Sequence, residues 1–194
     1  MNIIGLTGPS GSGKSSLTPI AKELGFYVID CDTVARRVAE DKKVLEALEK
    51  AFGDVLKNGS LDRKALAQKA FSSKEKTDLL NSIMLPEISI QIKAEIEKAK
   101  DMGYSNVLLD APTLFESGED KICSAVIAVL CSREQRAKRI LERDNLTKEQ
   151  LESRLKACQP DEYYKSKTGH IIYNDDDFEE YKVSAKNLLQ NLIK

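Results

Sequence analysis

Short apolar runs alternate along the chain with longer segments in which apolar residues recur every three or four positions. The runs predict β-strands at residues 2–6, 26–30, 106–111, 125–131 and 170–173. The run AVIAVLC is apolar at every position, which is typical of a central strand in a parallel sheet. Strands that alternate with helices predict an α/β fold, in which helices cover both faces of the sheet.

The longer segments predict helices. Leu17, Ile20 and Leu24 have helical spacing after the first predicted strand. We expect Pro19 to kink that helix and Pro86 to break or kink the helical stretch around it, because proline lacks the backbone donor. The predicted helices span residues 14–24, 33–52, 62–71, 77–85, 87–102, 133–143, 147–157 and 177–193.

A stretch predicted to be all helical, from about residue 54 to 100, separates the second predicted strand from the third. It is far longer than a simple crossover between parallel strands requires. Asp62 is placed to cap a helix within it, after a turn at residues 58–60. Insertions of this kind on a rigid scaffold often bind a second substrate, and that is our interpretation of this stretch.

The composition excludes several function classes. There are 30 basic and 31 acidic residues, which argues against a nucleic acid or an anionic membrane as the main partner. The four cysteines form no C-x-x-C pair and there is one histidine, His170, so a zinc site is not indicated and reduced thiols are expected. No apolar run approaches membrane-spanning length, and we expect a cytoplasmic protein.

The segment GPSGSGKS fits the phosphate-binding pattern G-x-x-x-x-G-K-[ST] between a predicted strand and a predicted helix. Its glycines allow backbone N–H groups to surround a phosphate, and the helix N-terminus adds a positive dipole end. Lys14 should neutralise nucleotide phosphate oxygens, and Ser15 should offer its hydroxyl to Mg²⁺. The residues expected to bind ATP here are Gly8, Ser10, Gly11, Ser12, Gly13, Lys14, Ser15 and Ser16.

Charged residues beyond this loop could complete the site. Asp110 ends the third predicted strand and could hold the hydration shell of Mg²⁺, or it could cap the turn that follows. Arg136, Arg139 and Arg143 share one face of a predicted helix, and Arg154 lies on the next helix. Such a face can be a solvated surface, or its guanidinium groups can cover ATP.

Two carboxylates, Asp30 and Asp32, stand one residue apart at the end of the second predicted strand. Residues two apart along a strand share a face, so both can point toward the carboxyl edge of the sheet, where α/β proteins bind ligands. Asp32 is the candidate to accept the proton of an acceptor hydroxyl or to orient that hydroxyl. It could instead cap a helix that begins at Thr33, and the two roles are compatible.

Among phosphate-loop proteins, the residues favour a small-molecule kinase. The guanine-reading N-K-x-D pattern and the D-x-x-G pattern of switch GTPases are absent from the sequence, and the chain is short for a motor. The acceptor could be a nucleotide or another small metabolite. A nucleotide-binding regulator without turnover is the alternative from another class, and the presence of Lys14, Ser15 and Asp32 together argues against it.

The chain resembles the dephospho-coenzyme A kinase family almost from end to end. The resemblance rests on GLTGPSGSGKSS, LGFYVIDCDTVAR, FGDVLKNGSLDRKAL, VLLDAPTLFE, RILERD and the late IIYN. It implies a three-layer P-loop fold with a five-stranded parallel sheet, a helical CoA-binding insertion and a lid. It also implies phosphorylation of the 3′-hydroxyl of dephospho-CoA by ATP with Mg²⁺. The sequence leaves the oligomeric state open, and we expect a monomer or small homo-oligomer.

The resemblance assigns roles to individual residues. Asp32 corresponds to the family's base, and Lys14 and Arg139 complete the catalytic set. Arg143 and Asn174 join Arg139 as further ATP-binding residues. The substrate-binding residues implied are Asp32, Arg36, Arg63, Asp110, Pro112, Leu114 and Phe115.

The resemblance also implies a domain organisation within one kinase unit. We expect a core at about 1–53 and 104–194, a CoA-binding insertion at about 54–103, and lid elements at about 112–124 and 136–160.

The chain departs from the family pattern in three places. Leu85 stands before Pro86 where the family usually has histidine, which removes one possible contact to the CoA portion. Thr168 and Gly169 replace an Ala-Asp pair, and Gly8-Pro9 replaces a glycine pair.

Overall fold

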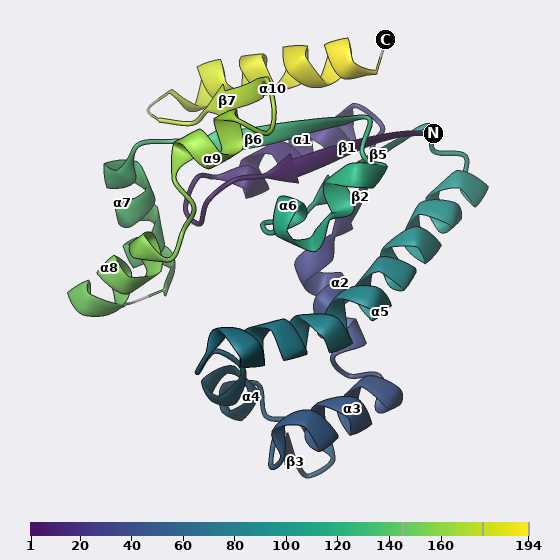
Figure 1. The fold of residues 1–194 in the computed structure, drawn as a ribbon. Helices are drawn as coiled ribbons and strands as arrows, with labels where there is room; N and C mark the ends of the chain where they lie inside the picture. The colour runs from purple at the N-terminus through teal and green to yellow at the C-terminus, as the bar shows by residue number, and fades with distance from the viewer. Residues whose placement is uncertain (145, 176, 194) are drawn as a thin grey trace. The chain divides into compact units, whose positions relative to one another are not determined.

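The structure, a computed structural model, describes residues 1–144, 146–175 and 177–193 (Figure 1). The chain divides into two compact units, which are described separately. The first combines Met1–Ile29 with Ala99–Lys194, and the second is Asp30–Lys98. None of the described helices combines the length and the apolar character needed to span a membrane.

The first unit is built on a five-stranded sheet with the order β2-β5-β1-β6-β7. The pairs β1/β5, β1/β6 and β6/β7 are parallel. This confirms the predicted α/β fold, and each predicted strand is observed within a residue or two. Leu6 pairs with Asp110, which places the end of β5 level with the end of β1. The strands are β1 (Asn2–Thr7), β2 (Tyr27–Asp30), β5 (Asn106–Asp110), β6 (Ala125–Leu130) and β7 (His170–Tyr173).

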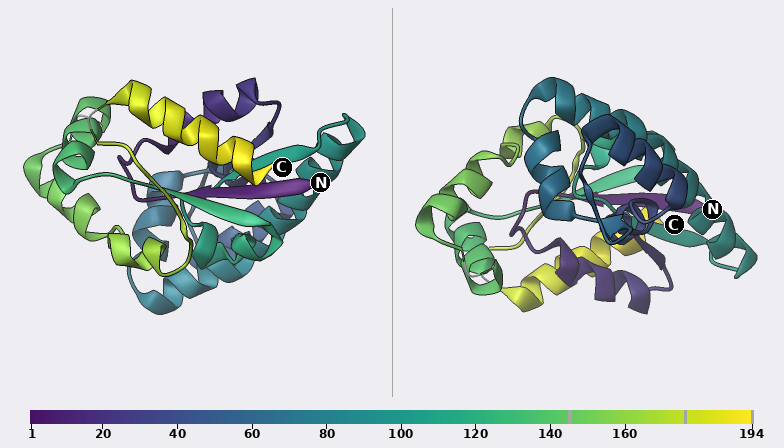
Figure 2. Two further views of the ribbon diagram at one scale, coloured as in Figure 1. Left: turned by 90° about the horizontal axis from the view of Figure 1, so that it is seen from above. Right: turned by 90° about the horizontal axis from the view of Figure 1, so that it is seen from below.

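Helices cover both faces of this sheet, because successive residues of its buried strands point to opposite sides. Ile127 and Val129 of β6 pack in the cluster formed with α1 (Leu17–Glu23) and α10 (Phe178–Leu192). Figure 2 shows these two helices side by side. Ala128 and Leu130 instead pack with Tyr164 of α9 and Phe115 of α6 on the other face. These two short helices are α6 (Leu114–Ser117) and α9 (Asp161–Lys165).

A helical pair, α7 (Arg133–Asp144) and α8 (Lys148–Lys156), follows β6. Ile140 of α7 packs with Leu151 and Leu155 of α8, where apolar spacing of four residues forms one buried stripe. Both helices were predicted. Two 3₁₀ helices complete the first unit, η1 (Lys14–Ser16) and η2 (Glu119–Ile122).

The second unit is mainly helical. Its α3 and α4 are in contact, and each buries an apolar stripe at spacings of four. A two-stranded antiparallel hairpin, which was not predicted, encloses the predicted turn at residues 58–60. The predicted cap at Asp62 is confirmed, because its side chain accepts bonds from the N–H groups of Lys64 and Ala65. The elements are α2 (Cys31–Val38), α3 (Lys42–Phe52), β3 (Leu56–Lys57), β4 (Ser60–Leu61), α4 (Arg63–Ala70) and most of α5 (Lys74–Asp101).

The helix predicted at 33–52 is two helices. It is interrupted after Val38, and the Asp41 side chain caps the second helix by accepting a bond from the Lys43 N–H. An aspartate at this position can serve as an N-cap, which the apolar periodicity alone did not reveal.

The predicted kink at Pro19 and the predicted break at Pro86 were wrong, whereas a kink at Pro86 stays a prediction. Pro19 lies in the first turn of α1, because residues 14–16 form η1 and the α-helix begins at Leu17. Backbone donors in a first turn have no intrahelical partner, so proline is tolerated there. Pro86 lies within α5, which runs without a break from Lys74 to Asp101. The many residues flanking Pro86 on both sides maintain the helix at the expense of one backbone bond.

Candidate active site

The glycine-rich loop leaves β1 and enters η1 and α1, which is the context that the sequence predicted. Gly8, Gly11 and Gly13 all have positive φ angles, of 143°, 82° and 90°. The Lys14 ammonium donates a hydrogen bond to the Gly8 carbonyl over 2.8 Å. The lysine therefore reaches back across the loop from its last residues to its first, where a bound phosphate would meet it.

Two predicted ATP-binding residues, Arg139 and Asn174, contact the outside of this loop. The Asn174 side-chain amide donates to the Ser12 carbonyl over 3.0 Å, and Arg139 Nη1 donates to the same oxygen over 3.3 Å. Arg139 Nη2 also donates to the Asn174 side-chain oxygen, over 3.3 Å. Asn174 is 6% exposed and Arg139 is half-buried, so this network supports the loop through the Ser12 carbonyl. Their predicted contacts with ATP stay predictions.

Cys131 lies in the same network. Its sulfur is 3.7 Å from the Gly11 carbonyl and 3.5 Å from Arg139 Nη1. Burial raises the pKa of this thiol, although the guanidinium groups of Arg139 and Arg136 act in the opposite direction. Cys131 is therefore a protonated, buried thiol at neutral pH, as expected for a reduced structural cysteine.

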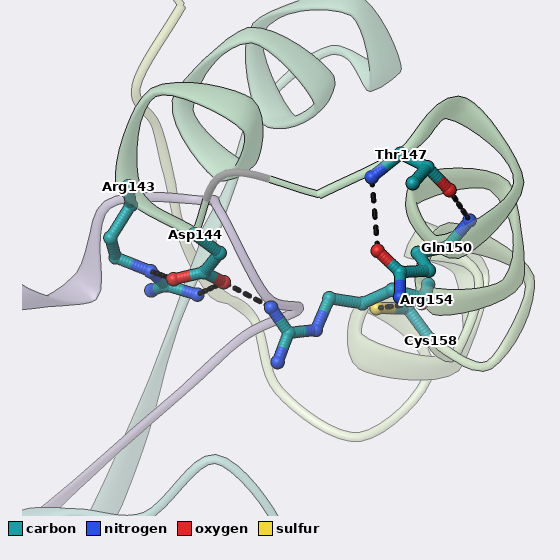
Figure 3. Close-up of polar contacts among 6 residues, drawn as sticks. All are labelled: Arg143, Asp144, Thr147, Gln150, Arg154 and Cys158. Carbon is teal, nitrogen blue, oxygen red and sulfur yellow. Dashed lines mark hydrogen bonds and ion pairs between the residues drawn. The ribbon is translucent and has the colours of Figure 1, made fainter.

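Arg143 and Arg154 both engage Asp144, at the ends of α7 and α8 (Figure 3). Arg143 donates to both carboxylate oxygens, over 2.7 and 2.8 Å, and Arg154 donates to one of them. Figure 3 also shows the capping box that begins α8, in which Thr147 and Gln150 bond each other's backbone N–H groups. Arg143, predicted to bind ATP, is thus held by a neighbouring carboxylate in this structure.

Hydrogen bonds from Arg143, together with the nearby charge of Arg154, hold the pKa of Asp144 at about 2. Since the folded pKa is depressed, the contacts stabilise the fold above the ordinary aspartate pKa of about 3.9 and lose that effect as the pH falls toward 2. We expect Asp144→Asn to lower the urea midpoint slightly at pH 7, because these side chains are partly exposed. The gap to wild type should narrow as the pH falls from about 5 to 3. A gap that stays constant over that range would contradict this.

The last residue of β5 and the segment after it contain four predicted substrate-binding residues, Asp110, Pro112, Leu114 and Phe115. Thr7 at the end of β1 donates a hydrogen bond to the Pro112 carbonyl over 3.2 Å, so this segment is fixed beside the start of the glycine-rich loop. Asp110 and Phe115 are half-buried. Leu114 is fully buried over Gly5, which counts against its predicted contact with the acceptor.

An aromatic cluster beside Phe115 was missed by the sequence analysis. Tyr163 packs edge-on against both Phe115 and Tyr164, with ring centroids 6.0 and 5.3 Å apart. The Lys167 ammonium lies 5.1 Å from the Phe115 ring centre and 4.9 Å from that of Tyr163. The signal in the sequence, YYKSK, is too short and too common to have indicated a site on its own.

The two acids of the second predicted strand are not equivalent. Asp30 ends β2 and caps α2, accepting bonds from the Thr33 N–H over 3.1 Å and from the Thr33 hydroxyl over 2.8 Å. Asp32 lies in the first turn of α2 and is exposed. The inference that both share a strand face was wrong, and so was the alternative that Asp32 caps the helix. Asp32 thus has an exposed carboxylate in the first turn of α2.

The predicted arginines of the second unit differ in their contacts. Arg63, at the start of α4, forms an ion pair with Glu40 over 2.9 Å. Arg36 is exposed on α2, one residue before Arg37, which pairs with Glu95 over 2.9 Å. The roles of Arg36 and Arg63 in substrate binding stay predictions.

The described residues contain no cluster of three or more His, Cys, Asp or Glu side chains that could hold a metal ion. That finding is compatible with Mg²⁺, which is usually bound through one or two protein groups together with substrate phosphates and water. Ser15 is exposed directly after Lys14, so its hydroxyl suits the predicted role.

Comparisons with known proteins give the family. A family model described as dephospho-CoA kinase matches residues 2–180. The dephospho-CoA kinase of Corynebacterium glutamicum is 35% identical over 193 residues, which cover 98% of this chain and 96% of that relative.

Two solved structures are similar to this chain over nearly its whole length. TT1252 from Thermus thermophilus superimposes with a TM-score of 0.86 at 30% identity, covering 98% of this chain and 97% of that one. The dephospho-CoA kinase from Campylobacter jejuni gives a TM-score of 0.71 at 28% identity, with 98% and 96% covered. The chain therefore belongs to the dephospho-CoA kinase family and is an ATP-dependent kinase.

Proposed function

We propose that the chain transfers the γ-phosphoryl group of ATP to the 3′-hydroxyl of dephospho-CoA, giving coenzyme A and ADP. The observation that carries this is a glycine-rich loop with Lys14 across it, in a chain that matches the family over residues 2–180. In the reaction, the bond between the γ-phosphorus and the β,γ-bridging oxygen breaks. A bond from the 3′-oxygen to that phosphorus forms, and the hydroxyl proton is transferred to a base.

The roles of individual residues follow from their chemistry. Lys14 neutralises charge on the transferring phosphoryl group, and Arg139 and Arg143 add guanidinium groups on the ATP side. Asp32 accepts the hydroxyl proton, since a carboxylate can do so at neutral pH when the proton leaves as the new bond forms. Ser15 holds Mg²⁺, which when bound offsets negative charge on the phosphates.

We further propose that residues 54–103 bind the CoA portion of the acceptor. Separate roles in acceptor binding are proposed for Arg36 in the second unit and for Asp110, Pro112 and Phe115 in the first. Arg63 begins a helix within residues 54–103 and carries a positive charge suited to a phosphate of the CoA portion.

The test is ADP production from MgATP by the purified protein, with dephospho-CoA and nucleoside monophosphates offered in separate reactions. We expect turnover with dephospho-CoA alone, and a product with one additional phosphate at the 3′-position by phosphorus NMR. Turnover on a monophosphate instead would reassign the acceptor. Tight ATP binding without turnover on any acceptor would favour a regulator.

A further inference from the structure

We propose that Arg136 is a positioning residue of the phosphate-binding loop, which fixes the Ser10–Gly11 peptide so that its N–H group faces the phosphates of the nucleotide. The proposal rests on the proposed use of this loop to bind ATP. It assigns Arg136 a role distinct from a lid arginine that touches ATP.

Arg136 lies beneath the loop and is shielded from solvent. It is 7% exposed, and its Nε donates a hydrogen bond to the Ser10 carbonyl over 3.0 Å. A Cβ atom at Gly11 would lie 2.8 Å from the Arg136 carbonyl oxygen, so α7 packs directly against the loop. Its Nη2 is buried and has no hydrogen-bond partner among the described residues. A buried cation without full pairing is costly, which argues that the position serves more than packing.

The bond to Ser10 is one of several that hold loop carbonyls from outside. The Ser12 carbonyl accepts bonds from Asn174 and Arg139, and the Tyr181 hydroxyl donates to the Gly13 carbonyl over 3.5 Å. Burial raises the pKa of Tyr181 well above its ordinary value, so the phenol keeps the proton that it donates.

These contacts orient the opposite side of each peptide. In a planar trans peptide, the C=O of one residue and the N–H of the next point in opposite directions. The described residues contain no cis peptide bond. The carbonyls of Ser10, Ser12 and Gly13 point toward the side chains that donate to them. The N–H groups of the residues that follow, Gly11, Gly13 and Lys14, therefore point away from those side chains, where successive N–H groups can form an anion-binding nest.

Arg136 donates to the Ser10 carbonyl, the first of these three carbonyls along the chain, and its donor is charged. Charged donors form stronger hydrogen bonds than neutral ones. Its charge also contributes positive potential beneath the loop, where solvent screens it little. Loss of Arg136 should therefore weaken phosphate binding without removing any group that touches the nucleotide.

The test compares Arg136→Met with Arg136→Gln, two neutral side chains of equal length. The glutamine amide nitrogen occupies the chain position of arginine Nε and can donate to Ser10, whereas the methionine methyl group cannot. Calorimetric titration with MgADP measures phosphate binding without an acceptor. We expect Arg136→Met to weaken MgADP binding by about tenfold or more relative to Arg136→Gln. The bond that Arg136→Met loses orients a backbone N–H group that donates to the phosphate. The KM for dephospho-CoA should stay within about twofold in both variants.

The control is Lys138→Gln, which removes a positive charge from an exposed position of the same helix and should leave MgADP affinity unchanged. Equal MgADP affinity in the methionine and glutamine variants would overturn the proposal. A loss of MgADP binding that reflects only a lower fraction of active protein would also overturn it. Equal rises in the KM values for ATP and for dephospho-CoA would do the same.

If Arg136→Met does not fold, the MgADP affinity of Arg136→Gln is compared with that of the wild type. A loss of affinity beyond about tenfold in folded Arg136→Gln would then overturn the proposal. If dephospho-CoA is not the acceptor, these MgADP affinities can still be measured, because no acceptor is present in the titration. The two proposals can therefore fail independently.

Discussion

Replacement of Asp32 by asparagine is expected to lower turnover by roughly 10²–10⁴-fold, the usual contribution of a general base. Asparagine keeps the size of the side chain but cannot take the hydroxyl proton. Asp32 is exposed in the first turn of α2 and is not the cap of that helix, so the change should leave the fold intact. Steady-state rates with saturating MgATP and dephospho-CoA measure the loss, and MgADP affinity should stay within about twofold.

The matched control is Asp30→Asn, two residues earlier. It removes a neighbouring negative charge, yet asparagine caps helices as well as aspartate does, so the bonds to Thr33 can persist. We expect near wild-type turnover from this variant. Unchanged turnover in Asp32→Asn would exclude a role as base, and collapse in Asp30→Asn alone would transfer that role to Asp30.

The sheet could be predicted from the sequence because its strands are short apolar runs bounded by polar residues or glycine. The division of the segment at 33–52 into two helices was missed because a local polar contact overrides the apolar period there. The Asp41 side chain caps α3, which begins after a break that a periodicity of 3.6 residues conceals. The helices α6 and α9 are four and five residues long, too short for any period to be visible.

The candidate site was only partly predictable, for a similar reason. The glycine-rich loop is contiguous, so its residues could be named from their spacing alone. Its supports are not contiguous: Arg136 lies 126 positions from Ser10, and Asn174 lies 162 positions from Ser12. Helical spacing placed Arg136, Arg139 and Arg143 on one face, but it could not show that Arg136 is buried while Arg143 pairs with Asp144.

Replacement of Gly13 by alanine should abolish nucleotide binding while leaving most of the protein folded. The added Cβ would lie 2.0 Å from the Asn174 side-chain nitrogen, an impossible distance, so either Asn174 or the loop must move. Asn174 is buried and bonded to Ser12, which prevents it from yielding easily. The φ angle of 90° adds backbone strain. We expect MgADP binding to weaken by at least about a hundredfold and stability to fall by about 1–3 kcal/mol.

Gly25→Ala separates the two causes, since Gly25 has a comparable φ angle of 80° but no atom within 4 Å of an added Cβ. This variant should show the strain alone, a loss of about 1 kcal/mol in unfolding free energy with MgADP affinity unchanged. Urea denaturation and calorimetric titration measure the two quantities in each protein. If Gly13→Ala binds MgADP as Gly25→Ala does, the contact between the loop and Asn174 does not set the shape of the phosphate site. A loss confined to Gly13→Ala ties that shape to the side chain of Asn174, which lies far from Gly13 along the chain, as close packing between distant segments requires.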